Sequence, residues 1–194
     1  MRYGVGFVGE MNQQKMLYDK VIEDLKSIDA KSIIIAIDGV AGSGKSTLAA
    51  NLAKDLIDCE IIHMDDLYAG WHNPFSDDLS SRIINQVLIP YCKLIEFNYQ
   101  KYNWKSESFD SAVLLKRKKY LIIEGVGAAQ RAFHKYFNKI ILIEFEANLG
   151  LERVLKRDGE ILREQMTNFL IDQAKLFEKE VPNIYADYIF EGAP

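Results

Sequence analysis

Short apolar runs alternate with segments of helical periodicity along most of the chain. The first run, residues 32–37, is nearly unbroken and rich in β-branched residues, which is typical of a strand buried on both faces. Similar runs occupy residues 60–63, 120–123, 140–145 and 188–190. Because strands that alternate with helices need crossover connections, the pattern predicts a three-layer α/β fold around a mostly parallel sheet of about five strands.

Three segments have the hydrophobic spacing of helices. Residues 16–28 predict an amphipathic helix that covers another element, and residues 45–57 predict a helix that follows the first strand. The region from Pro74 to Lys119 is less regular. There we expect a helix over about residues 78–98 and then a polar, aromatic segment over residues 102–109.

The 194 residues, 48% of them hydrophobic, are enough for one domain with a substantial core and few for two. We therefore predict a single domain with three special regions. Residues 1–31 form an N-terminal helical extension, residues 74–119 a candidate substrate-side insertion, and residues 148–165 a candidate lid.

Charge and cysteine content narrow the range of partners. A net charge of −4 and a pI near 5.5 argue against nucleic acid and membrane surfaces, so a small-molecule acceptor fits better. Cys59 and Cys92 lie far apart and suggest neither a zinc site nor a disulfide framework. The apolar stretch over residues 3–9 is short and no cleavage site follows it, and no run could span a bilayer. We expect a cytoplasmic protein, and a homo-oligomer is compatible with this composition.

The strongest motif starts directly after the first predicted strand. Residues 39–46 fit the pattern G-x-x-x-x-G-K-[ST], and a predicted helix follows, as a P-loop requires. Glycines let the backbone wrap an anion, Lys45 adds a cation for the β- and γ-phosphates, and Ser46 offers a hydroxyl to Mg²⁺. The sequence therefore predicts binding of ATP with Mg²⁺ in a P-loop NTPase fold. The candidate nucleotide-binding residues are Gly39, Val40, Ala41, Gly42, Ser43, Gly44, Lys45, Ser46 and Thr47.

Carboxylates follow two later strands at the edge where ligands of parallel sheets bind. Asp65 follows the second strand and is the candidate base that accepts a hydroxyl proton, while Glu124 follows the third and is a candidate metal ligand. Capping or turn roles are the alternative for both. We interpret His63 as the last residue of its strand rather than as a catalyst, and Asp38 as a possible brace of the loop.

Arginines follow the fourth strand. Arg153 and Arg157 stand four residues apart on one face of a predicted helix, and Arg163 comes shortly after. Guanidinium groups on a mobile segment can neutralise charge on a transferring phosphoryl group, so Arg157 joins Lys45 among the candidate catalytic residues. Neighbouring acidic residues make surface ion pairing the alternative.

Several stretches together resemble the uridine kinase branch of the P-loop kinases. They are IAIDGVAGSGKSTLA, MDDLY, IIEGV, RVLKRD and the closing YADYIFEG. The resemblance implies that Asp65 is the base toward a nucleoside hydroxyl, that Tyr68 contacts the substrate, that Glu124 serves the metal site and that Arg157 is the lid arginine.

A further stretch, Tyr102-Asn103-Trp104, is similar to a Tyr-Asp-Phe element of uridine kinases that contacts the nucleoside. The resemblance makes Tyr102 and Trp104 candidate substrate residues, although both could also be ordinary core. Asn103 replaces the aspartate, and Glu107 or Ser108 stands where uridine kinases place a histidine that reads the base. The acceptor implied is a nucleoside or a similar compound.

Two alternatives to an ATP-dependent transfer to a hydroxyl stay open. A nucleoside monophosphate kinase would need cations for the acceptor phosphate, which Arg82 and the cluster over residues 116–119 could supply. A nucleotide-dependent binding module would hydrolyse ATP slowly and control a protein partner, but it would not need a base such as Asp65.

Overall fold

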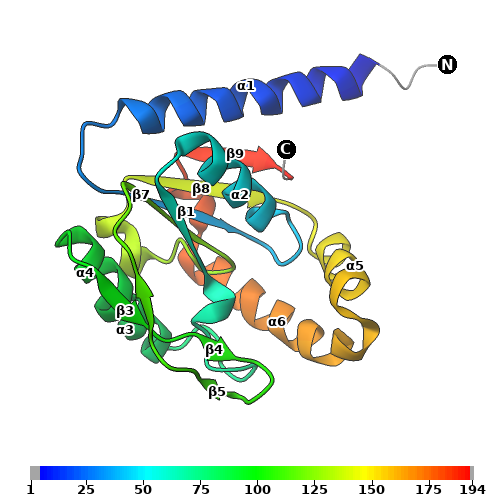
Figure 1. Cartoon of the computed structure of the whole chain (residues 1–194). Coiled ribbons are helices and arrows are strands. Elements are labelled where there is room, and N and C mark those ends of the chain that lie inside the picture. The colour runs from blue at the N-terminus through cyan, green and yellow to red at the C-terminus, as the bar shows by residue number, and fades with distance from the viewer. Residues whose placement is uncertain (1–4, 193–194) are drawn as a thin grey trace.

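A five-stranded parallel sheet lies at the centre of the computed structural model, which describes residues 5–192 (Figure 1). Its strand order is β2-β7-β1-β8-β9, and every pairing within it is parallel. This confirms the predicted fold class. The strands are β1 (Ile33–Gly39), β2 (Cys59–His63), β7 (Tyr120–Glu124), β8 (Lys139–Glu144) and β9 (Tyr188–Glu191).

Helices cover both faces of this sheet. The α-helices are α1 (Val5–Ser27), α2 (Lys45–Leu56), α3 (Asp77–Ile83), α4 (Ile89–Cys92), α5 (Ala147–Asp158) and α6 (Arg163–Glu180). Short 3₁₀ and π turns are η1 (Met64–Asp66), η2 (Ile84–Leu88), η3 (Arg131–Tyr136), η4 (Glu160–Leu162) and η5 (Pro182–Ile184). Two small antiparallel ladders pair β3 (Phe97–Tyr99) with β6 (Val113–Leu115), and β4 (Tyr102–Asn103) with β5 (Ser108–Phe109).

Strand β1 contributes side chains to the hydrophobic cores on both faces of the sheet. All seven of its residues are buried, as its β-branched sequence predicts. Ile33, Ile35 and Ile37 belong to the core shared with α1 and α2. Ile34 belongs to the core on the other face, which includes Ile83 of α3 and Phe169 of α6. Alternate side chains of one strand thus bind the two helical layers to the sheet.

The N-terminal helix is longer than its periodicity indicates. It begins at Val5 and packs against α2 and β9, where the Tyr188 hydroxyl bonds to Asp24. Residues 1–4 of the predicted N-terminal extension lie outside the described residues. Within the described range of 5–192, no helix combines the length and the apolar character that crossing a membrane requires.

The predicted helix over residues 78–98 is wrong at its C-terminal end. Helical structure runs from Asp77 through the π turn η2 and stops at Cys92, and Pro90, which cannot donate a backbone hydrogen bond, stands where η2 passes into α4. Leu94 then has a φ of 60°, which no helix accommodates. The next residues, Phe97–Tyr99, form strand β3 instead, because they pair with β6 later in the chain.

The carboxyl ends of three neighbouring strands meet at one edge of the sheet. In the register of the sheet, Glu124 of β7 lies between Ile37 of β1 and His63 of β2. The loop after β1 and the turn after β2 therefore flank Glu124, as expected for a ligand site of an open parallel sheet.

Candidate active site

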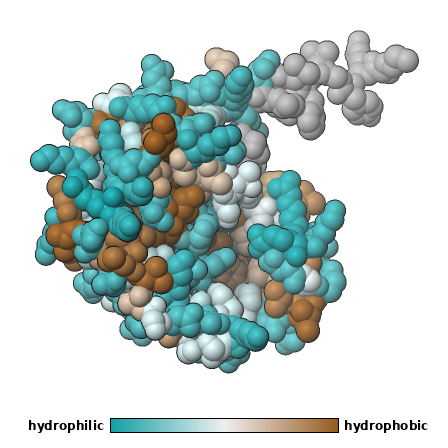
Figure 2. Space-filling view, in the orientation of Figure 1, coloured by the Kyte–Doolittle hydropathy of each residue, from teal (hydrophilic) through white to brown (hydrophobic). Residues whose placement is uncertain are grey.

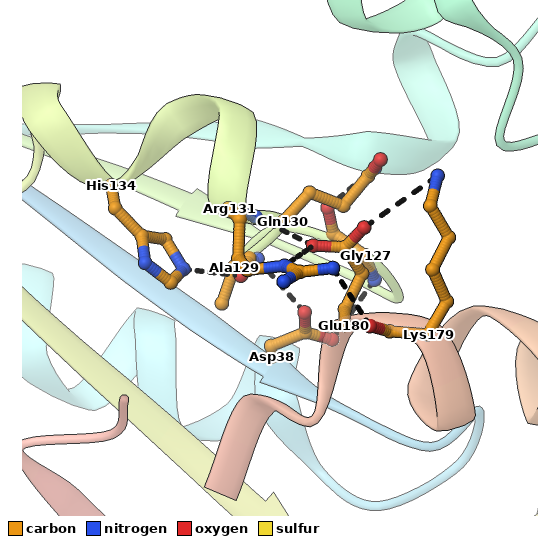
Figure 3. A network of polar contacts seen from close by, with 8 residues as sticks. All are labelled: Asp38, Gly127, Ala129, Gln130, Arg131, His134, Lys179 and Glu180. Atoms are coloured by element: carbon orange, nitrogen blue, oxygen red, sulfur yellow. Dashed lines mark hydrogen bonds and ion pairs between the residues drawn. The ribbon is translucent and has the colours of Figure 1, made fainter. Parts of the chain in front are cut away.

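The P-loop connects β1 to α2, and the carboxylate of Asp38 stabilises it through hydrogen bonds. This carboxylate is 2% exposed and accepts backbone N–H bonds from Gly39 (2.7 Å), Gly127 (2.9 Å) and Ala129 (2.8 Å). Figure 3 shows Asp38 pointing at the turn that follows β7. The bracing role expected for Asp38 is thus present, and it joins the P-loop to the turn that begins after Glu124.

Hydrogen bonds connect the segment after β7 to the C-terminal end of α6. The backbone N–H of Arg131 donates to Glu180 Oε2 at 2.8 Å, and its guanidinium donates to the Lys179 carbonyl at 3.0 Å (Figure 3). His134 Nε2 lies 2.9 Å from the Ala129 carbonyl on the other side. These contacts fix the segment after β7, and they therefore also fix the backbone N–H groups that bind Asp38.

Two further anchors of the P-loop were not identified from the sequence. The buried side chain of Gln173 in α6 accepts the Ala41 N–H at 2.9 Å. Gly150 in α5 lies so close that a Cβ added to it would meet the Ala41 carbonyl oxygen at 2.1 Å. A glycine inside a helical pattern signals such a close approach, whereas nothing local in the sequence marks Gln173.

A cavity of about 380 Å³ opens at this edge of the sheet. In the orientation of Figure 1, Figure 2 shows a hollow between the body of the molecule and the α5–α6 segment, with mostly hydrophilic residues on its rim. The cavity is lined by Ala41, Gly42, Lys45, Ser46, Asp65, Tyr68, Trp71, Trp104, Glu124, Gly125, Val126, Val154, Arg157, Asp158, Leu162, Met166 and Phe169. Residues predicted from five separate stretches of the sequence therefore border one cavity.

The polar end of the cavity contains the P-loop lysine and a hydroxyl–carboxylate pair. Lys45 is 7% exposed and its Nζ donates to the Val40 carbonyl at 2.7 Å. Burial lowers the pKa of Lys45, and the nearby carboxylates of Asp38, Glu124 and Asp65 oppose that shift. Ser46 Oγ donates to Glu124 Oε1 at 2.9 Å.

The Ser46–Glu124 pair fits Mg²⁺. Both groups offer hard oxygen ligands, and Glu124 is only 4% exposed. Among residues 5–192 no group of three His, Cys, Asp or Glu side chains could hold a metal ion by itself. Mg²⁺ typically takes one or two protein ligands together with phosphate oxygens and water, so this set matches its needs. His63 ends β2, as expected, and its Nδ1 lies 2.5 Å from Glu124 Oε1.

Asp65 and Asp66 belong to the 3₁₀ turn η1, and their side chains make different contacts. Asp65 lines the cavity, whereas Asp66 pairs with Lys101 at 2.8 Å. Burial raises the pKa of Asp65, and the negative charge of Glu124 adds to this effect. A more basic carboxylate is a better proton acceptor at neutral pH.

Of the three arginines predicted near the lid, only Arg157 lines the cavity. Its guanidinium is bidentate to Asp158, at 2.7 Å for Nε and 2.6 Å for Nη2. Arg153 stacks on the Phe145 ring with 4.0 Å between the guanidinium carbon and the ring centroid. Arg163 forms surface ion pairs with acidic neighbours, which is the alternative interpretation for that residue.

Aromatic side chains also line the cavity. Trp104 lies against Trp71, with 4.8 Å between their ring centroids and 55° between their planes, and we call this pair the aromatic wall. Tyr68 also lines the cavity, but it is 1% exposed and its hydroxyl donates to the Val126 carbonyl at 2.6 Å. Tyr102 packs edge-on against Trp104 and is not among the lining residues. Trp71 was not singled out from the sequence, since a lone tryptophan in a loop has no distinguishing pattern.

Other candidates lie away from the cavity. Glu107 and Ser108 are exposed at the turn of the β4–β5 hairpin. Arg82 donates to the Leu67 carbonyl at 2.5 Å and stacks on the Phe109 ring. The basic cluster over residues 116–119 precedes β7, at the sheet edge opposite the P-loop. The cations suggested for an acceptor phosphate therefore do not border the cavity.

Comparison with known proteins yields one match to a family model and one short match to a curated relative. The model of the viral superfamily 1 RNA helicase core domain matches residues 35–97, which contain the P-loop. Human (Homo sapiens) nicotinamide riboside kinase 1 is 53% identical over 38 residues, which are 20% of this chain and 19% of that protein. The match thus spans about a fifth of the length of the human protein.

Solved structures match over nearly the whole chain. A possible uridine kinase from Bacillus stearothermophilus has a TM-score of 0.67 at 19% identity, over 92% of this chain and 100% of that chain. The chain has the fold of P-loop kinases. A candidate fructose transport system kinase from Silicibacter sp. TM1040 has a TM-score of 0.64 at 17% identity, over 91% of this chain and 98% of that chain. At such identities the likeness concerns the fold, and the resemblance to uridine kinases expected from the motifs is confirmed at that level.

Proposed function

We propose that this protein is an ATP- and Mg²⁺-dependent phosphotransferase that moves the γ-phosphoryl group to a hydroxyl of a small metabolite. A nucleoside is the acceptor that we propose. The observation that carries the proposal is that Lys45, Ser46, Asp65, Glu124 and Arg157 all border one cavity that aromatic side chains also line. A nucleotide-dependent switch needs Lys45 and Ser46 but does not need a carboxylate that accepts the proton of a hydroxyl group.

Each residue has a role that follows from its chemistry. The P-loop and Lys45 hold the phosphates, and Ser46 and Glu124 would hold Mg²⁺, which would neutralise phosphate charge. The acceptor oxygen forms a bond to the γ-phosphorus, the bond from that phosphorus to the β–γ bridging oxygen breaks, and ADP leaves. Asp65 takes the proton of the acceptor hydroxyl, and Arg157 neutralises charge on the transferring group.

The aromatic wall supports a planar acceptor. Trp71 and Trp104 offer ring faces on which a base can stack, and such stacking tolerates different bases because every base has a π-face. Within this proposal, residues 74–119 form the acceptor side of the cavity and residues 148–165 the lid. The names of the matched proteins suggest uridine, nicotinamide riboside and fructose as acceptors to compare. We expect the two nucleosides to be better acceptors than the sugar.

A screen of acceptors with a matched pair of variants tests the proposal. Purified protein with Mg²⁺-ATP is assayed for phosphorylated product with nucleosides, nucleoside monophosphates and sugars. Asp65→Asn should lower transfer at least ~10²-fold while ATP binding stays within about twofold. Asp19→Asn removes the same charge from an exposed residue of α1, outside the cavity, and should change transfer less than about twofold. Hydrolysis of ATP that no acceptor accelerates would favour a binding module, and transfer retained by Asp65→Asn would remove this residue from the base role.

A further inference from the structure

Trp104 lies where the acceptor wall meets the turn that carries Asp65. Its ring lines the cavity and contacts Trp71, as described above. On the other side, its indole Nε1 donates a hydrogen bond of 3.0 Å to the backbone carbonyl of Asp65. A single side chain therefore touches both the proposed acceptor site and the main chain of the proposed base.

The turn η1 has little hydrogen bonding of its own to define its position. It is a three-residue 3₁₀ turn, followed by backbone bonds from Leu67 N–H (2.9 Å) and Tyr68 N–H (3.1 Å) to the Met64 carbonyl. Short 3₁₀ turns have poorer hydrogen-bond geometry than α-helices. The direction of the Asp65 carboxylate thus depends on contacts from outside the turn.

The β4–β5 hairpin and α3 supply these contacts. Lys101, directly before β4, pairs with Asp66 at 2.8 Å. Arg82 of α3 donates to the Leu67 carbonyl, and its guanidinium stacks 4.3 Å from the ring centroid of Phe109 in β5. Each of the three consecutive residues 65–67 is therefore held by the hairpin itself or by a side chain stacked on it. Among these contacts, the hydrogen bond from Trp104 is the one made to Asp65 itself.

We propose that Trp104 is a positioning residue for the proton transfer. Its N–H fixes the backbone of Asp65 so that the carboxylate faces the cavity, and its ring links acceptor binding to this contact. The inference rests on the proposed function, in which the acceptor hydroxyl gives its proton to Asp65. A displacement of about 1 Å in a reacting group can cost ~10²-fold in rate, so a bond that fixes the base has a catalytic effect without touching the reacting atoms.

Two tryptophan-to-phenylalanine variants separate positioning from wall formation. Trp104→Phe reduces the wall as Trp71→Phe does but also removes the N–H, so its kcat should fall at least about fivefold while its acceptor KM rises no more than in Trp71→Phe. Trp71→Phe alters the wall without removing a bond to η1, so it should mainly raise the acceptor KM. ATP affinity should be unchanged in both. A wild-type kcat in Trp104→Phe would overturn the inference.

Hydrogen exchange gives a second readout that needs no activity. In the protein without ligands, Trp104→Phe should speed exchange of the Leu67 and Tyr68 amides at least about fivefold, while amides of β1 keep their wild-type rates. Wild-type exchange at both amides would overturn the inference even if no acceptor is ever found, so its failure is distinguishable from failure of the proposed function. If Trp104→Phe does not fold, Trp104→β-(3-benzothienyl)alanine retains the bicyclic ring, lacks the N–H and is subject to the same two criteria.

Discussion

Replacing Gly150 with alanine sets two effects of opposite sign against each other. Alanine inside a helix is more favourable than glycine by about 1 kcal/mol, so propensity alone predicts stabilisation of α5. The added Cβ, however, would lie 2.1 Å from the Ala41 carbonyl oxygen, whereas ordinary contact begins at 3.4 Å. The oxygen belongs to the main chain of the P-loop and the added Cβ is fixed to the backbone of α5, so no side-chain rotation relieves the clash. The helix and the P-loop must therefore separate.

The magnitude follows from these two terms. Forcing an extra carbon into a packed interior costs about 1–3 kcal/mol, so after the gain in propensity the free energy of unfolding should fall by about 0–2 kcal/mol. The effect on nucleotide binding should be larger, because Ala41 and Gly42 line the cavity and would move with the loop. We expect Mg²⁺-ATP affinity to fall at least ~10-fold.

Urea unfolding and calorimetric titration with Mg²⁺-ATP measure the two effects separately. Lys156→Ala serves as the control, because this residue is exposed on the same helix and its replacement tests helix propensity without the contact. A Gly150→Ala protein that is about 1 kcal/mol more stable, with ATP affinity within about twofold of wild type, would refute the reasoning. It would mean that the contact between α5 and the P-loop does not exist in solution.

Three further predictions concern other described residues. Arg157→Met should lower the rate of transfer at least ~10²-fold in a steady-state assay, whereas Arg163→Met, which removes the same charge from a surface ion pair, should change it less than about threefold. Gln173→Leu leaves a P-loop N–H without its buried acceptor and should cost about 1–3 kcal/mol in urea unfolding; an unchanged midpoint would contradict this. Burial raises the pKa of the Cys59 thiol to about 12, so iodoacetamide at neutral pH should alkylate the exposed Cys92 first, and mass spectrometry of the peptides would reveal the reverse order.

The sheet and the P-loop could be predicted because their signals are local. A strand buried on both faces needs a continuous apolar run, and each of the five predicted runs became a strand of the central sheet. The end of the helix near Cys92 could not be predicted in this way. The apolar residues of Phe97–Tyr99 fit a helical spacing, and what makes them a strand is pairing with Val113–Leu115, which the local pattern does not contain.

In the candidate site, too, residues with a local sequence signal could be predicted and residues placed by tertiary contacts could not. Glu124 ends its strand, and Lys45 and Asp65 lie within a few residues of the ends of theirs, so the edge of a parallel sheet brings them together once the fold is known. Trp71 and Gln173 join the site only through tertiary contacts. The bond from Ala41 to Gln173 spans 132 positions, and no periodicity or motif encodes such a contact.

The anchors of the P-loop also limit which part of the predicted lid can move. Residues 148–165 begin with a segment in which Gly150 lies directly on the P-loop, and α6 returns to the same loop through Gln173. Rotation of α5 as a whole would break the contact on which the shape of the phosphate site depends. The freedom that remains lies between these anchors, around Gly159, whose φ of 107° ends α5, and the exposed 3₁₀ turn η4. Arg157 stands at the start of this stretch, and we therefore propose that a lid movement here would be local, releasing its guanidinium from Asp158 toward a phosphoryl group while the P-loop stays fixed.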